Sequence, residues 1–134
     1  MLNPIPELLT LGFFAPFILR VVAGLIFLSL GYRHAVKERA ATTAAVNERW
    51  GQVGTFFVWY LGIAEVTAGL LILLGLWTQI GAVIGAVIAV KMLLLKRKHA
   101  VLAKESTAFY GLLLAICLSL LISGAGALAF DLPL

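Results

Sequence analysis

The sequence predicts an all-α, multi-pass membrane protein: an antiparallel bundle of four transmembrane helices with both termini on the extracytoplasmic side. Of its 134 residues, 63% are apolar and 12% are charged, against roughly 45–50% and 25% in soluble proteins. The mean hydropathy is +1.10. The apolar residues form four long runs, and the basic residues gather between them. A soluble domain of this size could not bury so much apolar surface.

Each of the four runs approaches the length that a membrane-spanning helix needs. Crossing the hydrocarbon core takes about 20 mostly apolar residues, and a helix satisfies its own backbone groups in lipid. We place the spans at about 14–33, 55–77, 79–95 and 106–130, in one domain covering residues 1–134. Pro16 suits the first turn of a helix, where its missing N–H costs little. The third run is the shortest, and Lys91 interrupts it.

The basic residues indicate how the spans are oriented. Eight of the ten occupy two loops: Arg33, Lys37, Arg39 and Arg49 follow the first span, and Lys96, Arg97, Lys98 and Lys104 follow the third. The segment before Pro16, the turn LWTQI and the tail FDLPL contain no lysine or arginine. The positive-inside rule therefore places both loops in the cytoplasm. We read the net charge of +4 as a sign of topology and expect no nucleic-acid partner.

Small residues at regular spacing indicate where helices can approach closely. The first span offers Gly24 and Gly31, and the second offers Gly62 and Gly69 around Glu65. The third and fourth spans have comparable positions, which predicts a compact bundle. We interpret the alanine-rich stretch HAVKERAATTAAVNERW as a solvated connector, with a helical extension of the first span or a short surface helix as the alternatives.

Three ionisable residues fall inside the spans, namely Arg20, Glu65 and Lys91. Glu65, in GIAEVTAG, is the only charge in its span and lies near mid-membrane. A charge at that depth must find a partner or become neutral, and intramembrane acids often mark functional sites. We expect Glu65 to pair with Arg20 or Lys91 beside a pocket for a polar head group. The alternative is an ion pair that only sets helix register, and the long side chain of Lys91 could instead reach the inner surface.

Other chemically capable residues give weaker indications. Glu105 precedes the fourth span, where a carboxylate suits a helix N-terminus, and Asp131 is expected to form a cap or turn. Cys117 is the only cysteine, so we expect it to fill space in the core. His34 and His99 look too isolated to hold a metal. The chain has no phosphate loop, catalytic triad or haem attachment motif, and we assign it no catalytic residue.

Three stretches in this order resemble the DoxX family of small bacterial four-helix membrane proteins. They are LRVVAGLIFLSLGYRH, AEVTAGLLILLGLWTQIGAVI and the closing GAGALAFD. The resemblance implies motif residues at Arg20, Gly24, Gly31, Glu65, Gly69, Gly75, Thr78, Gly124, Gly126 and Asp131. The sequence departs from the family pattern at Gln79, at Arg33-His34 and at Ala129. Thr78 and Asp131 thereby join Glu105 as secondary site candidates.

The resemblance also implies a first hypothesis for the function. The family name is associated with a membrane subunit of thiosulfate:quinone oxidoreductase, and other members are linked to oxidative-stress complexes. We therefore expect a non-catalytic subunit in the bacterial cytoplasmic membrane, with quinone bound by Glu65 and Arg20. A membrane or peripheral redox partner would supply electrons, because the chain has no redox centre of its own.

Two alternatives come from other classes of protein. One is binding or transport of a small anion or lipid, because two cations and one anion lie within the spans. Transport by four helices would need a homo-oligomer. The other alternative is a structural accessory subunit of a larger membrane complex, in which the buried charges only fix assembly.

Overall fold

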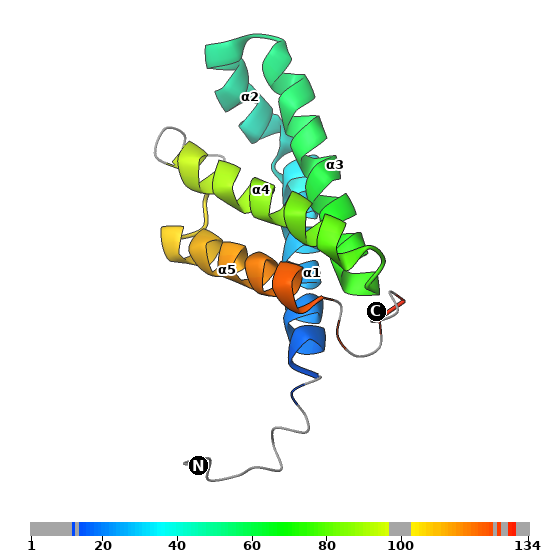
Figure 1. Ribbon diagram of the computed structural model, residues 1–134. Coiled ribbons are helices and arrows are strands. Elements are labelled where there is room, and N and C mark those ends of the chain that lie inside the picture. Colours follow the sequence, from blue (N-terminus) through cyan, green and yellow to red (C-terminus); the bar gives the residue numbers. More distant parts are fainter. Residues whose placement is uncertain (1–11, 13, 97–102, 125, 127–128, 131–134) are drawn as a thin grey trace.

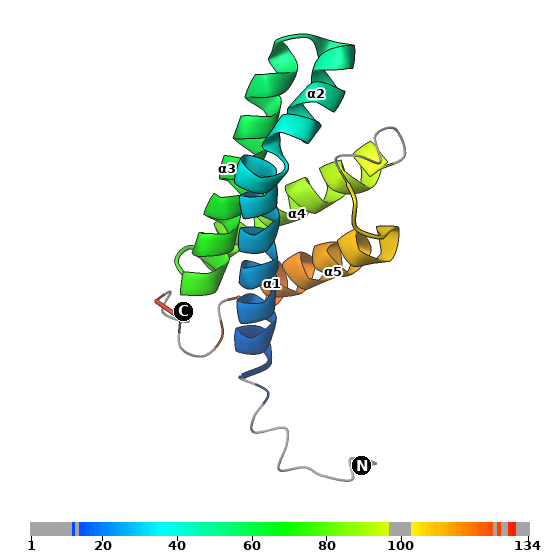
Figure 2. The same ribbon diagram turned by 180° about the vertical axis from the view of Figure 1, so that it is seen from behind.

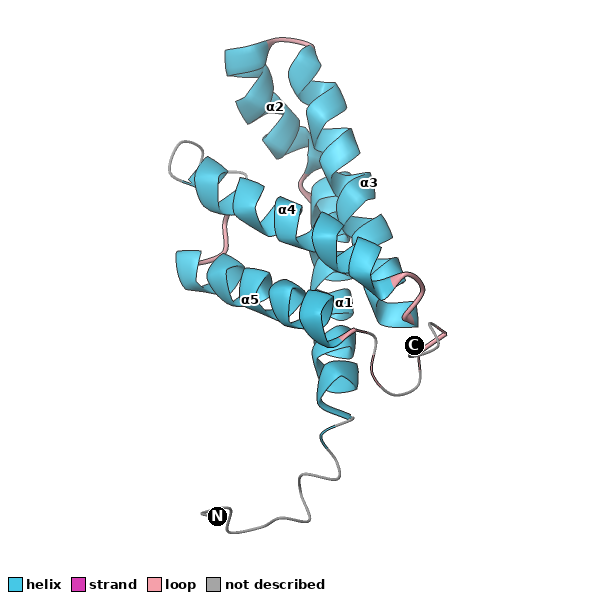
Figure 3. Cartoon of the chain, in the orientation of Figure 1, coloured by secondary structure: helices cyan, strands magenta, loops and turns pink. Residues whose placement is uncertain are grey.

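The computed structural model describes residues 12, 14–96, 103–124, 126 and 129–130, and every regular element within them is helical. The elements are α1 (Ala15–Tyr32), the π-helical turn η2 (Arg33–Lys37), α2 (Arg39–Trp50), α3 (Val53–Leu74), α4 (Thr78–Lys96) and α5 (Thr107–Ser123). Figure 3 shows that helices make up most of the described chain. The predicted all-α class is confirmed. Asp131 and His99 lie outside the described residues.

The helices are arranged as two pairs with an extension at one end. α1 and α3 lie side by side in opposite directions, and α4 and α5 form a second pair that runs obliquely to the first (Figures 1 and 2). η2 and α2 follow α1 in the chain, and the turn after α2 leads into α3, which runs back along α1 (Figure 1). The stretch expected to be a solvated connector is therefore helical, which was the alternative interpretation. Its valine Val46 packs on Val58 and Phe57 of α3.

Length and hydropathy identify the protein as a multi-pass membrane protein. Three of the described helical segments are long and apolar enough to cross a membrane: Ala15–Lys37, Val53–Leu74 and Thr78–Lys96. Thr107–Ser123 is a shorter apolar helix. Lys91 interrupts the apolar run but not the helix: α4 is continuous through it, and its side chain is exposed on the helix surface.

The last helix ends before the predicted boundary at residue 130. α5 stops at Ser123, and Gly124 adopts φ 74°, with Gly126 at φ 67°. These left-handed backbone conformations are accessible to glycine and cannot continue a right-handed helix. Gly126 then comes so close to α1 that an added Cβ would lie 2.7 Å from Cβ of Pro16. Gly126 therefore packs against the start of α1.

Glycines allow α1 and α3 to approach each other closely. A Cβ added to Gly31 would lie 2.9 Å from the backbone nitrogen of Val66, and one added to Gly69 would lie 2.9 Å from that of Leu28. Gly24 is similarly close to Leu73 of α3, and Gly62 is similarly close to Ala35 of η2. Because the neighbouring atoms belong to the backbone, they cannot move aside as a flexible side chain would. The close helix contact predicted from these glycines is confirmed.

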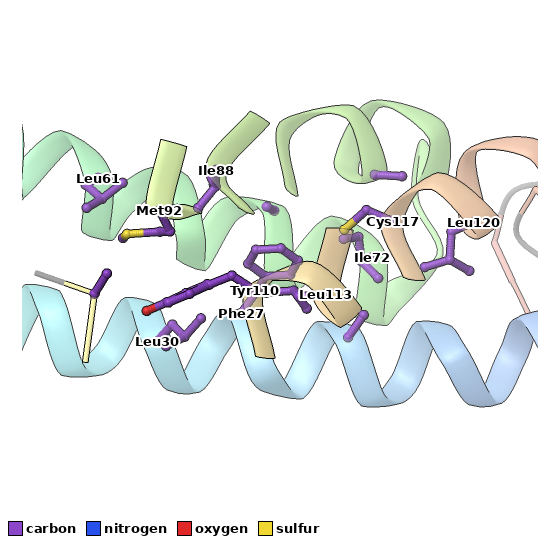
Figure 4. Close-up of a cluster of buried hydrophobic side chains, with 14 residues drawn as sticks. Phe27, Leu30, Leu61, Ile72, Ile88, Met92, Tyr110, Leu113, Cys117 and Leu120 are labelled. Atoms are coloured by element: carbon purple, nitrogen blue, oxygen red, sulfur yellow. The ribbon is translucent and has the colours of Figure 1, made fainter. Parts of the chain in front are cut away.

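The apolar core lies between the two helix pairs. Buried side chains from all four apolar helices face one another there (Figure 4): Phe27, Leu30, Leu61, Ile72, Ile88, Met92, Tyr110, Leu113, Cys117 and Leu120. A Cβ on Gly85 would lie 3.0 Å from Sγ of Cys117. Cys117 is free and buried, as expected for a space-filling residue.

We predict that Gly69→Ala destabilises the protein, whereas Gly111→Ala does not. The added methyl group at Gly69 would overlap the backbone of α1, and such overpacking costs about 1–3 kcal/mol. Gly111 has open space at its Cβ position, so alanine there should be neutral or slightly stabilising. Thermal unfolding of the two variants in one detergent checks this. Equal midpoints would contradict the tight α1–α3 contact.

Candidate functional site

Glu65 lies near the middle of α3 and is completely enclosed by protein. It is about 18 Å from the start of the helix and about 14 Å from its end, at 1.5 Å per residue. Its side chain has 0% exposure, and its Oε2 lies 2.7 Å from Nδ1 of His34. The side chain of His34 is 5% exposed. A carboxyl group and an imidazole thus form a buried hydrogen-bonded pair between η2 and α3.

The geometry of η2 brings His34 to this position. α1 continues without a break into the π-helical turn. The N–H of Glu38, the residue that follows the turn, donates to the carbonyl of Arg33 over 2.7 Å. π-helical turns change the direction of the side chains that follow them and are frequent at functional sites. The absence of a side chain at Gly62 lets η2 approach, since a Cβ there would lie 3.0 Å from Cβ of Ala35. His34 therefore faces α3 directly.

The hydrogen bond can be made in two ways. Either an Nδ1–H of His34 donates to the carboxylate of Glu65, or a protonated carboxyl donates to Nδ1. The two forms differ in the position of one proton. The second oxygen of Glu65, Oε1, is buried and has no hydrogen-bond partner among the described residues. Because an unsatisfied buried oxygen is costly, this atom is a ready position for a further proton or for a small donor.

The predicted pairing of Glu65 with Arg20 or Lys91 is wrong. Arg20 is buried at the opposite end of α1, with its guanidinium 5.4 Å from the ring centroid of Phe17. It lies against Gly75, where an added Cβ would be 2.5 Å from Nη1 of Arg20. Gly75 is ten residues beyond Glu65, or about 15 Å along α3. Lys91 is exposed on α4.

Of the secondary candidates, the two that the structure describes, Thr78 and Glu105, do not gather around Glu65 either. Thr78 is buried as the first residue of α4, at the same end of the bundle as Arg20. Glu105 was expected to cap α5, but Ser106 is the capping residue, and its hydroxyl accepts a hydrogen bond from the N–H of Phe109 at 3.1 Å. The carboxylate of Glu105 turns instead toward η2.

An ion-pair network links η2 to the start of α5. Arg33 lies 2.6 Å from the carboxylate of Glu105 and 3.5 Å from that of Glu38. Lys104 lies 3.1 Å from Glu38, and this contact holds the pKa of the Glu38 carboxyl below its usual value. Lys96 also donates to the backbone carbonyl of Glu105. The network holds together the end of the bundle that contains His34.

Two residues near Glu65 were not identified from the sequence. His34 was set aside as an isolated loop residue, although its three-residue spacing from Gly31 would place both on one face of a continuing helix. Tyr110, on α5, is a second polar residue that is buried in the core. Among the described residues, no three His, Cys, Asp or Glu side chains form a metal-binding group.

We predict that His34→Ala lowers the free energy of unfolding by about 3 kcal/mol or more, because removal of one partner leaves the other polar group buried and unpaired. The double variant His34→Ala/Glu65→Leu should recover much of that loss, since the orphaned carboxyl is gone. A double-mutant cycle measured by unfolding in detergent tests the coupling. Additive effects of the two substitutions would show that the residues do not interact.

Comparison with known proteins places this site within a family. No curated protein and no solved structure matches the chain. The sequence profile of the DoxX family matches residues 15–96, from the start of α1 to the end of α4. Both members of the His34–Glu65 pair lie in this region, whereas the closing glycines and Asp131 lie beyond it. Since the matched region is more than half of the chain, the protein belongs to the DoxX family.

Proposed function

We propose that this protein is a non-catalytic membrane subunit of a quinone-linked redox or oxidative-stress complex, and that the His34–Glu65 pair transfers protons within it. One observation carries the proposal, namely the 2.7 Å contact between a carboxyl group and an imidazole, both buried in membrane-spanning segments. The quinone itself enters from the family resemblance. A partner protein supplies the electrons.

The chemistry of quinones makes such a pair useful. Quinone reduction takes up protons together with electrons, and those protons must reach the membrane interior. Histidine is the side chain best suited to gain and lose a proton near neutral pH, and buried acid–histidine chains are typical of proton relays in membranes. The ion-pair network of Arg33, Glu38, Lys104 and Glu105 begins at the residue next to His34. Lys104, 48% exposed, gives this end of the bundle contact with water.

The burial of Glu65 limits how a quinone could be bound. With no exposed surface, its carboxyl group could touch a quinone head group only if α1 and α3 separated. We therefore assign the pair to proton transfer and place the head group at the contact with the partner subunit. This replaces the expectation from the sequence that Glu65 and Arg20 together bind the quinone head group, because these two residues lie at different levels of the bundle.

We also propose that the chain lies in the bacterial cytoplasmic membrane, with the basic ends of η2 and α4 on the cytoplasmic side. Protons would then enter the pair from the cytoplasm.

The main competing function is that of a structural accessory subunit. It is favoured by the position of the pair beside Gly31 and Gly62, where α1 and α3 are in close contact. Under that alternative, substitutions of Glu65 would lower the amount of protein in the membrane without a separate effect on electron transfer.

We predict that Glu65→Gln slows electron transfer to the quinone pool by about a hundredfold or more, the scale expected when one acid–base group is lost. Glutamine retains the size of the side chain and a hydrogen bond to His34, so the protein should still accumulate. The rate of quinone reduction is measured in membrane vesicles and divided by the amount of protein.

Glu48→Gln serves as the matched control, because Glu48 is an exposed acid on α2. An unchanged normalised rate in Glu65→Gln would refute proton transfer by the pair. Reduced accumulation with a normal rate per molecule would support the structural alternative.

A further inference from the structure

A groove on the lipid-facing surface separates α3 from α4 and has a volume of about 180 Å³. Figures 1 and 2 show the two helices diverging toward the basic end of the molecule. From α3 the groove is lined by Phe57, Tyr60, Leu61 and Ala64. The α4 side consists of branched aliphatic residues and one charged residue, Lys91. The groove is therefore apolar along most of its length and carries a single positive charge.

Lys91 lies near the basic end of this groove. It is five residues from the last residue of α4, or about 8 Å along the helix. Tyr60 lies on α3 and is 60% exposed. It is about 11 Å from Val53, the first residue of α3, which lies at the same basic end of the bundle. Lys91 makes no hydrogen bond or ion pair with any residue that the structure describes. At this depth its ammonium group can reach the level of the lipid head groups.

We propose that the groove binds one anionic phospholipid, with an acyl chain between α3 and α4 and the phosphate at Lys91. Charge complementarity selects this occupant. A lysine in contact with lipid needs an anion to offset the cost of its position, and none comes from the described protein. The hydroxyl group of Tyr60 can donate a second hydrogen bond to the phosphate. This site is separate from the His34–Glu65 pair and does not depend on the function proposed for it.

A neutral quinone and a second protein copy fit the groove less well. The apolar walls would accept a prenyl chain, but a neutral head group would leave the charge of Lys91 uncompensated. An apolar helix from another copy would also leave the charge of Lys91 uncompensated. The phosphodiester of an anionic phospholipid supplies the charge and the acyl chain in one molecule.

Native mass spectrometry of the full chain tests the proposal. The purified protein is mixed with equal amounts of phosphatidylglycerol and phosphatidylcholine of matched chain length, and the bound lipids are counted. Wild-type protein should retain phosphatidylglycerol in preference. Lys91→Met should weaken its association about fivefold, the contribution of one basic side chain facing an anionic lipid. Val87→Trp, which fills the groove and leaves Lys91 in place, should reduce the retention of both lipids.

Lys37→Met is the matched control, because Lys37 is an exposed lysine of η2 outside the groove. It should leave phosphatidylglycerol binding unchanged. Equal retention of the two lipids by wild-type protein would overturn the proposal. So would equal losses in Lys91→Met and Lys37→Met, or a neutral quinone that displaces phosphatidylglycerol from the wild-type protein.

Discussion

The hydrogen bond between His34 and Glu65 depends on how closely α1 approaches α3. A carboxyl group in the middle of a membrane helix is tolerated only if a partner reaches it. The partner here comes from η2, and Gly31 and Gly62 remove the side chains that would hold the two elements apart. Helix packing and the polar site are therefore one feature of the molecule. A substitution that separates the helices would also expose the acid.

The buried polar residues of the spans lie at two levels of the bundle. At one end, Arg20 and Thr78 are buried beside the turn between α3 and α4, where Gly75 is also close to Ala129. Nearer the middle of α3, the His34–Glu65 pair lies beside a network of arginine, lysine and glutamate side chains. Apolar side chains form the core between the two helix pairs (Figure 4). The two polar levels are therefore separate features of the bundle.

The sequence was sufficient to predict the helices but not the partner of Glu65. Hydropathy located all four apolar helices, because lipid exposure imposes the same requirement on every residue of a span. The glycine spacing predicted a compact bundle, and the structure shows that these glycines lie where α3 meets α1 and η2. Hydropathy falls at Arg33, so His34 was read as a loop residue, whereas the helix continues there through η2. Arg20 was placed inside the first span, but its distance from Glu65 depends on where that helix begins and on how the helices are shifted past each other.

Nuclear magnetic resonance of protein labelled with ¹⁵N at histidine tests the central contact most directly. The chain has two histidines, and a His34→Gln sample assigns the signals of His34. If the imidazole bonds to Glu65, the Nδ1 resonance of His34 should shift in Glu65→Gln, while the signals of His99 stay in place. A His34 resonance that titrates as in a free peptide, and that is the same in wild type and Glu65→Gln, would contradict the buried pair.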